Sequence, residues 1–183
     1  MRWARLMKIV LETPRLVLRE MSLGDLDFVA AMLADPQVMR FYPKCYSRDE
    51  AEAWVRRQLD RYARYGHGLW LVLDRAADEP VGQVGLAIQM VDGAEEPEIG
   101  YLIHRPFWRR GLATEAALAT RNYAFHTLGK SRVISLVRPI NVPSQGVAHK
   151  LGMEFDKLTT FANLEHLVFA VNAPGQCGCP SPG

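Results

Sequence analysis

The chain has 183 residues, of which 49% are hydrophobic and 23% are charged, and its formal net charge is +2. This composition predicts one globular domain with a sizeable core over residues 9–172, with flexible ends at 1–8 and 173–183. The mild charge excludes a typical nucleic-acid binder, and no apolar run is long enough for a membrane span or a secretion signal. We expect a cytoplasmic protein that is a monomer or a homodimer, with no nucleic-acid or membrane partner.

The first third of the chain predicts one strand followed by two helices. Each helix is opened by a capping box, formed by Ser22 with Asp25 and by Ser47 with Glu50. The predicted ranges are 15–21 for the strand and 22–34 and 47–65 for the helices. The second helix carries a basic stripe, which we interpret as a solvated face, made of Arg56, Arg57, Arg61 and Arg64.

The remainder predicts a mixed sheet. The expected strands are 68–74, 81–90, 98–103, 132–138, 153–161 and 166–171, the expected turns are 76–80 and 92–97, and the expected helices are 112–128 and 142–151. A strand, helix, strand passage inside an antiparallel meander requires one parallel pair. We therefore expect an α/β (α+β) fold with a mixed, mostly antiparallel sheet of about seven strands and helices on both faces.

The run W-R-R-G-L-A-T-E at 108–115 opens the long helix without Ser, Thr, Asp or Asn at the usual N-cap position. The first backbone N–H groups of a helix have no internal partner and carry partial positive charge. Gly111 allows a ligand to approach closely, and Arg109 and Arg110 add charge, so a phosphate or pyrophosphate is the expected cap. Capping by water with solvated arginines is the alternative. Both common nucleotide-binding fingerprints are absent, which disfavours a nucleotide-binding module.

The cysteines and histidines do not predict a metal site. Cys45 is isolated, and Cys177 and Cys179 lie in a Gly/Pro-rich tail that offers no further ligands. The histidines show no ligand spacing. We therefore expect no metal and no disulfide framework.

Four segments, taken in this order, resemble the Gcn5-related N-acetyltransferase (GNAT) family, especially the branch that includes ribosomal-protein-alanine N-acetyltransferases. They are T-P-R-L-V-L-R at 13–19, E-I-G-Y-L-I-H at 98–104, W-R-R-G-L-A-T-E-A at 108–116 and N-V-P-S-Q-G-V-A-H-K-L-G-M at 141–153. The resemblance covers residues 12–171. It implies that an acyl-coenzyme A, usually acetyl-CoA, binds where two parallel strands, 98–103 and 132–138, splay apart. Trp108 departs from the Gln or Arg that the family usually has there.

The resemblance also implies which groups hold the donor. Backbone N–H groups at the helix start would bind the pyrophosphate, and the pantetheine arm would pair with residues 101–103 like an added strand. Asn141 would bond to the pantetheine, although it also suits the N-cap of the helix at 142. The expected donor-binding residues are Tyr101, Leu102, Ile103, Arg109, Arg110, Gly111, Leu112, Ala113, Thr114 and Asn141.

Attack of an amine on a thioester needs a proton acceptor, because amines are protonated at neutral pH. Glu98 is the first candidate for the base and Glu165 its rival; an exposed carboxylate paired with an arginine is the alternative for Glu98. The resemblance implies that Ser144 protonates the departing thiolate, and an exposed residue in the first turn of the helix at 142 is the alternative for Ser144. A backbone N–H near Leu102 or Ile103 would stabilise the oxyanion.

The first two helices and the loop between them are expected to bind the acceptor, through Phe41, Tyr42 and Trp54. For Trp54, packing on the sheet is the alternative. The resemblance therefore implies an N-acyltransferase that moves an acetyl group from acetyl-CoA to a primary amine, on a protein N-terminus or a small molecule, by direct attack on the thioester. A catalytically silent acyl-CoA-binding sensor or partner module is the alternative.

Overall fold

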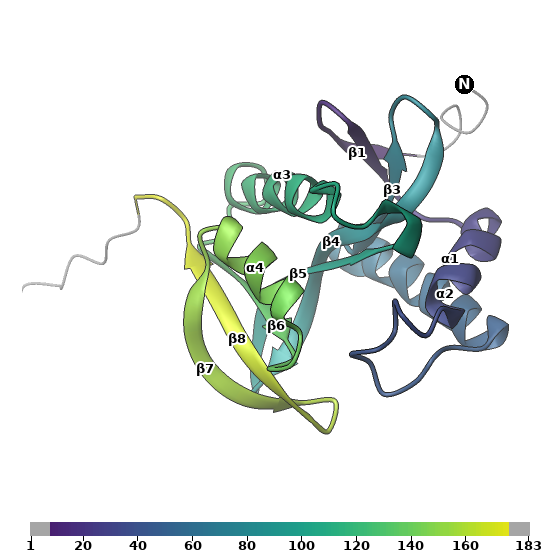
Figure 1. The fold of residues 1–183 in the computed structure, drawn as a ribbon. Coiled ribbons are helices and arrows are strands. Elements are labelled where there is room, and N and C mark those ends of the chain that lie inside the picture. The colour runs from purple at the N-terminus through teal and green to yellow at the C-terminus, as the bar shows by residue number, and fades with distance from the viewer. Residues whose placement is uncertain (1–7, 176–183) are drawn as a thin grey trace, which may run out of the picture.

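The computed structural model describes residues 8–175, and the segments 1–7 and 176–183, which hold Cys177, Cys179 and most of the expected flexible ends, lie outside it. Within the described range, eight strands form one sheet in the order β1-β2-β3-β4-β5-β6-β8-β7 (Figure 1). The strands are β1 (Ile9–Glu12), β2 (Leu16–Arg19), β3 (Leu69–Asp74), β4 (Glu79–Val91), β5 (Ala94–Ile103), β6 (Arg132–Val137), β7 (Glu154–Phe161) and β8 (Leu164–Asn172). The helices are α1 (Leu26–Ala34), α2 (Arg48–Tyr65), α3 (Leu112–His126) and α4 (Val142–Lys150).

This architecture confirms the expected fold class. Neighbouring strands run antiparallel except for β5 and β6, which are parallel. The strand that the sequence did not predict is β1, a four-residue segment paired with β2 at one end of the sheet. In the part of the chain that the structure describes, no helix is both long enough and apolar enough to cross a membrane.

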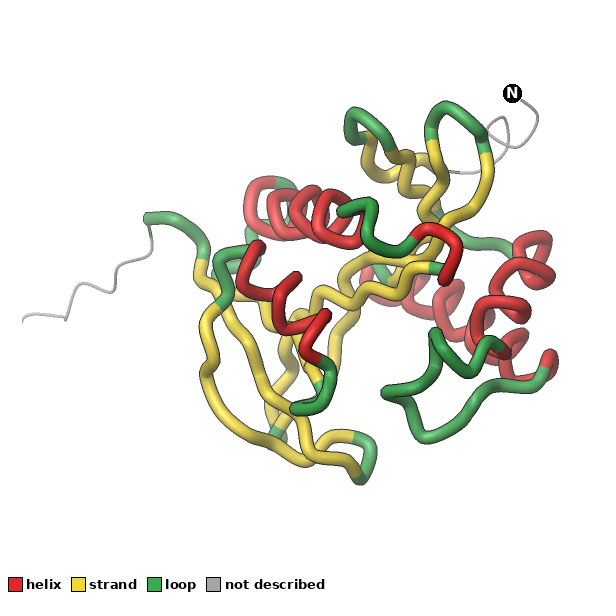
Figure 2. The backbone as a smooth tube through the Cα atoms, viewed as in Figure 1, coloured by secondary structure: helices red, strands yellow, loops and turns green. Residues whose placement is uncertain are grey.

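Helices cover both faces of the sheet, α1 and α2 on one and α3 and α4 on the other (Figure 2). Strand β3 lies between the two layers, so its consecutive side chains enter different cores. Trp70 packs in the α3 layer and Leu71 in the layer of α1 and α2, and both are almost fully buried. The near-continuous apolar run of β3 is what a strand covered on both faces requires.

Both predicted capping boxes form. Ser22 and Asp25 open a 3-10 turn that leads into α1, and Ser47 and Glu50 open α2. The turn expected at 92–97 is shorter than predicted, because Asp92 and Gly93 alone make it, both with positive φ angles of 50° and 84°. The residues that follow them extend β5.

Candidate active site

The parallel strands β5 and β6 pair at Glu98 and Ile134 and then separate. Beyond that point side chains link them: the Ser135 hydroxyl donates to the Ile99 carbonyl at 2.9 Å, and the Leu136 N–H donates to the Glu98 carboxylate at 3.4 Å. A regular parallel ladder would use backbone groups at both positions. The expected splayed pair is therefore present, and its gap opens toward the C-terminal ends of the strands.

The orientation of the β5 backbone decides which groups face this gap. Alternate residues of a strand direct their N–H and C=O groups toward the same neighbour. Because the Ile99 carbonyl bonds toward β6, the backbone groups of Tyr101 and Ile103 also face the gap. Leu102 instead faces β4, where its register partner is Gln83. Of the two residues considered for the oxyanion, Ile103 is the one whose N–H points into the gap.

The start of α3 has the geometry expected of an anion site. Its N-cap is Gly111, in the left-handed conformation with φ +77°, and no side chain caps the helix. Arg109, two residues earlier, also has a positive φ, 62°. The first helical N–H to find a backbone partner is that of Glu115, which donates to the Gly111 carbonyl at 3.0 Å. The amides of residues 112–114 therefore remain available to a ligand, as the sequence predicted.

Glu115 would oppose an anion at this helix start, but Arg15 neutralises its charge and Thr13 donates a hydrogen bond to it. The Thr13 hydroxyl donates to its carboxylate at 2.6 Å, and Arg15 pairs with it at 2.6 Å. Burial alone would raise the pKa of Glu115, yet these hydrogen bonds outweigh it and lower the pKa. Arg15 also donates to the Arg110 carbonyl at 2.9 Å, which fixes the turn before the helix.

Glu98 lies in the gap on the α2 side of the sheet. It is half-buried, and its carboxylate accepts a hydrogen bond from the Gln89 amide at 2.7 Å besides the one from Leu136. Burial raises its pKa, and the opposing effects of these two donors and of the positive Arg61 do not cancel the rise. A carboxylate with a raised pKa is a stronger base, which suits proton abstraction.

Glu165 lies in a different place from Glu98. It is exposed and lines a shallow pocket of about 410 Å³ with Asp92 and Thr159, between the β7–β8 hairpin and the β4–β5 turn. Side chains alternate along β8, so His166 rather than Glu165 shares a sheet face with the buried Val168. The structure therefore does not bring the two candidate bases into one pocket.

The N-terminal turn of α4 lies across the gap from β5. The side chain of Asn141 accepts from the Ser144 N–H at 3.2 Å, so the N-cap alternative for Asn141 is realised. Its amide NH₂ group is still able to donate to a ligand. The Tyr101 hydroxyl donates to the Ser144 carbonyl at 2.8 Å, and this contact, which the sequence did not predict, ties the turn to β5.

Of the expected acceptor residues, Trp54 packs in the layer of α1 and α2. The Trp54 indole donates to the buried Gln83 side chain at 2.9 Å. Trp54 therefore packs on the sheet, which was the alternative to a role in acceptor binding. Tyr42 is 41% exposed. Desolvation raises its pKa, and the negative charge of Glu98 adds to the rise.

Arg40 lies close to the aromatic rings of both Phe41 and Trp108. The Arg40 guanidinium is 4.4 Å from the Phe41 ring centroid and 5.8 Å from the Trp108 ring. The Trp108 indole donates to the Ile103 carbonyl at 2.6 Å. This bond holds the basic turn against the end of β5 and occupies the Ile103 carbonyl, so that only the N–H of Ile103 remains available in the gap. Within residues 8–175, no three His, Cys, Asp or Glu side chains are grouped to hold a metal.

Residues 15–154 match the family model described as an acetyltransferase (GNAT) domain. The chain belongs to the GNAT family. This N-acetyltransferase therefore has its splayed strands, the α3 start, Asn141 and Ser144 inside the matched region, whereas Glu165 lies beyond it. Several similar proteins from Bacillus are also named as N-acetyltransferases.

Similar proteins support this GNAT assignment over most of the chain. YkkB of Bacillus subtilis is 33% identical over 151 residues, which cover 82% of this chain and 88% of YkkB. A solved acetyltransferase of Agrobacterium tumefaciens strain C58 superposes with a TM-score of 0.79 at 29% identity, covering 88% of this chain and 93% of that one. RimL, a ribosomal L7/L12 acetyltransferase solved with coenzyme A, shares the fold at 16% identity, with a TM-score of 0.75 and coverage of 91% and 98%.

Proposed function

We propose that this N-acetyltransferase moves an acetyl group from acetyl-CoA to a primary amine, on a protein N-terminus or a small molecule. The observation that carries the proposal is the uncapped start of α3, with Gly111 at φ +77°, beside the open gap between β5 and β6. The coenzyme A bound to RimL, which has the same fold, supports this choice of donor. We expect the reaction in the cytoplasm, by a monomer or homodimer that needs no metal, nucleic acid or membrane.

The donor would be held mainly by backbone groups. Its pyrophosphate would bind the amides of residues 111–114, with Arg109 and Arg110 adding positive charge. The pantetheine arm would lie along Tyr101 and Ile103, whose backbone groups face the gap. The Asn141 amide would donate to the same arm. Leu102 would contribute no backbone bond, because its groups pair with β4.

In the proposed reaction the amine nitrogen attacks the thioester carbonyl, a C–N bond forms and the C–S bond breaks. Glu98 accepts the proton that the amine loses, directly or through water. A backbone N–H of β5 that faces the gap stabilises the oxyanion, and that of Tyr101 is nearer to Glu98 than that of Ile103. The Ser144 hydroxyl gives a proton to the departing thiolate and regains one from solvent, and Tyr101 holds the Ser144 turn in place.

A thiol-release screen with acetyl-CoA tests this function. The acceptor panel holds peptides with free N-termini, polyamines, amino acids and aminoglycosides, and mass spectrometry identifies the acetylated product. We expect the free thiol of coenzyme A to be released only when one class of acceptor is present. Binding of coenzyme A without turnover of any amine would instead favour the silent acyl-CoA-binding module.

Substitution Arg15→Ala is expected to weaken coenzyme A binding about fivefold at low salt. The reason is that Glu115 would then keep an uncompensated charge in the first turn of α3. Calorimetric titration measures the affinity, and adding Glu115→Gln to Arg15→Ala should restore it. Arg56→Ala, which breaks the ion pair with Glu52 on α2, is the control. Failure of Glu115→Gln to restore binding would contradict this explanation.

A further inference from the structure

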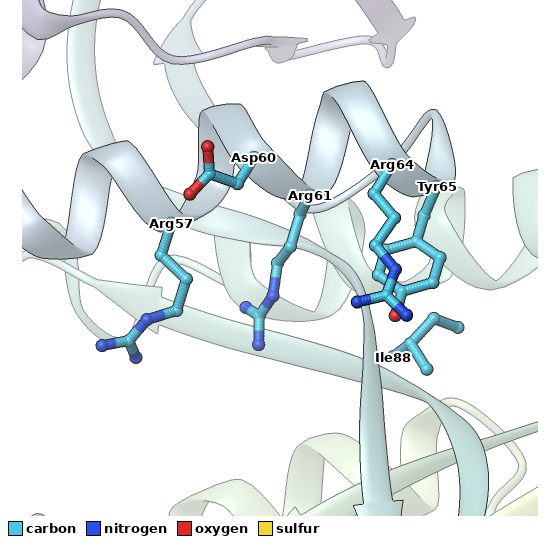
Figure 3. A pocket seen from close by; sticks show the side chains of 6 residues that line it. All are labelled: Arg57, Asp60, Arg61, Arg64, Tyr65 and Ile88. Atoms are coloured by element: carbon cyan, nitrogen blue, oxygen red, sulfur yellow. The ribbon is translucent and has the colours of Figure 1, made fainter.

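Part of the basic stripe of α2 lines a pocket. Arg57, Arg61 and Arg64 point from one side of the helix into a pocket of about 290 Å³ that Tyr65 and Ile88 also line (Figure 3). Asp60 belongs to the same lining, but its carboxylate points away from the three guanidinium groups (Figure 3). Arg56 lies outside the pocket and pairs with Glu52. The exposure of Arg56, Arg57 and Arg64 agrees with the interpretation as a solvated face, and the pocket is a feature that the sequence did not predict.

The three guanidinium groups are held in place but not neutralised. Arg57 lies 5.5 Å from the Trp54 ring and Arg64 lies 4.9 Å from the Tyr65 ring, while Arg61 donates to the Gln58 side chain at 3.4 Å. Among residues 8–175, none of the three forms an ion pair. Guanidinium groups fixed in this way are well suited to bind a carboxylate or phosphate.

The location of the pocket indicates which substrate it serves. The α3 start, where the donor phosphates would bind, belongs to the opposite face of the sheet, whereas α2 covers the face that carries Glu98. The strand geometry places the pocket beside Glu98, because Ile88 lines it and the next residue of β4, Gln89, donates to the Glu98 carboxylate at 2.7 Å. Burial and the charge of Arg57 lower the pKa of Arg61, and the charge of Glu98 acts in the opposite direction. The arginines therefore lie on the acceptor side, near the proposed base.

We propose that the acceptor is an amine that also carries an acidic group, which binds to Arg57, Arg61 and Arg64 while the amine reaches Glu98. This inference rests on the proposed function and names the acceptor class. The pocket is at the small end of ligand sites, so it takes a single acidic group or side chain rather than a whole ligand. Two sources share this chemistry, a free acidic amino acid and a peptide with acidic residues near its N-terminus.

Matched acceptors test the proposal in a thiol-release assay with acetyl-CoA. One arm compares glutamate with glutamine amide, and the other compares a C-terminally amidated tetrapeptide that has Asp and Glu at its second and third positions with the Asn and Gln version. In the arm that contains the natural type of acceptor, we expect kcat/KM to be about 10- to 100-fold higher for the acidic compound than for its neutral counterpart. Equal values within both arms would overturn the inference while leaving the proposed function intact.

The double variant Arg57→Glu/Arg64→Glu separates charge recognition from folding, because both side chains are exposed. It should remove the acidic preference mainly through KM and raise the relative rate with a polyamine. Arg56→Glu, on the same helix but outside the pocket, should retain the preference. If no amine turns over, the proposed function fails, and the inference is then decided by calorimetric titration with glutamate and with the acidic peptide. Saturable binding that the double variant loses supports the pocket, and its absence in the wild type overturns it.

Discussion

Replacement of Glu98 by Gln is expected to lower kcat about 10²- to 10⁴-fold, the usual loss when a positioned general base is removed. The protein should remain folded, because the Gln side chain can still accept from the Leu136 N–H and bond with the Gln89 amide. Steady-state kinetics with the best acceptor from the screen, together with thermal unfolding, measure both effects. A kcat within about twofold of the wild type would remove Glu98 from the base role.

The raised pKa of Glu98 fixes the sign of two pH effects. Activity should increase as pH rises through the raised value, since only the ionised carboxylate accepts a proton. Stability should change in the opposite direction, because a carboxyl group that resists ionisation in the folded state costs stability once it is charged. Glu98→Gln should therefore match or exceed the wild type in melting temperature at neutral pH, and the difference should close below the ordinary pKa of Glu, about 4.3.

Glu165→Gln is the matched control for this substitution. Glu165 is an exposed carboxylate in the pocket with Asp92 and Thr159, so its loss should leave kcat unchanged. The opposite pattern, with activity lost in Glu165→Gln and kept in Glu98→Gln, would reverse the assignment of the base.

Substitution Gly111→Ala should weaken coenzyme A binding about 10- to 100-fold, equivalent to one or more lost charge-assisted hydrogen bonds. Alanine at φ +77° is strained by about 1–2 kcal/mol, and a shift of the backbone that relieves the strain turns the helix amides away from the phosphates. Crowding is not the cause, because the nearest atom to an added Cβ is a nitrogen of the Arg15 guanidinium at 3.6 Å. Calorimetric titration with coenzyme A gives the change.

Gly129→Ala provides the control for backbone strain. Gly129 follows the other end of α3 with φ +63°, and an added Cβ there would meet nothing within 4 Å. Both variants should therefore lose similar stability, and only Gly111→Ala should lose affinity. A similar loss of affinity in the two variants would mean that general destabilisation, rather than the anion site, explains the effect.

Local chemistry made much of the fold predictable from the sequence. The capping boxes at Ser22 and Ser47 set the helix starts because they satisfy backbone groups within a few residues. The uncapped start of α3 could be predicted in the same way, because glycine at position 111 has no side chain that could cap the helix. The short β1 escaped prediction because four residues carry too little periodicity. The Asp92-Gly93 pair is a strong hairpin signal, and it could have given the tight turn.

The contents of the site were harder to predict, because they depend on contacts between residues that are distant in the chain. Gln89 and Arg61 gave no sequence signal as neighbours of Glu98, because the β4–β5 register positions Gln89 and the packing of α2 on the sheet positions Arg61. The separation of Glu165 from Glu98 depends on side-chain alternation in β8. Periodicity assigned the arginines of α2 to the outside of the helix, but it cannot tell open solvent from a pocket wall.

The pairing of Arg15 with Glu115 joins residues that are 100 positions apart in the chain. A fragment that held only β5 and α3 would retain Gly111 and the unbonded amides, yet its Glu115 would carry a bare negative charge beside them. Phosphate recognition is therefore a property of the assembled domain and not of a transplantable motif. Grafting the Trp108 to Glu115 run onto another scaffold would need a surrogate for the arginine as well.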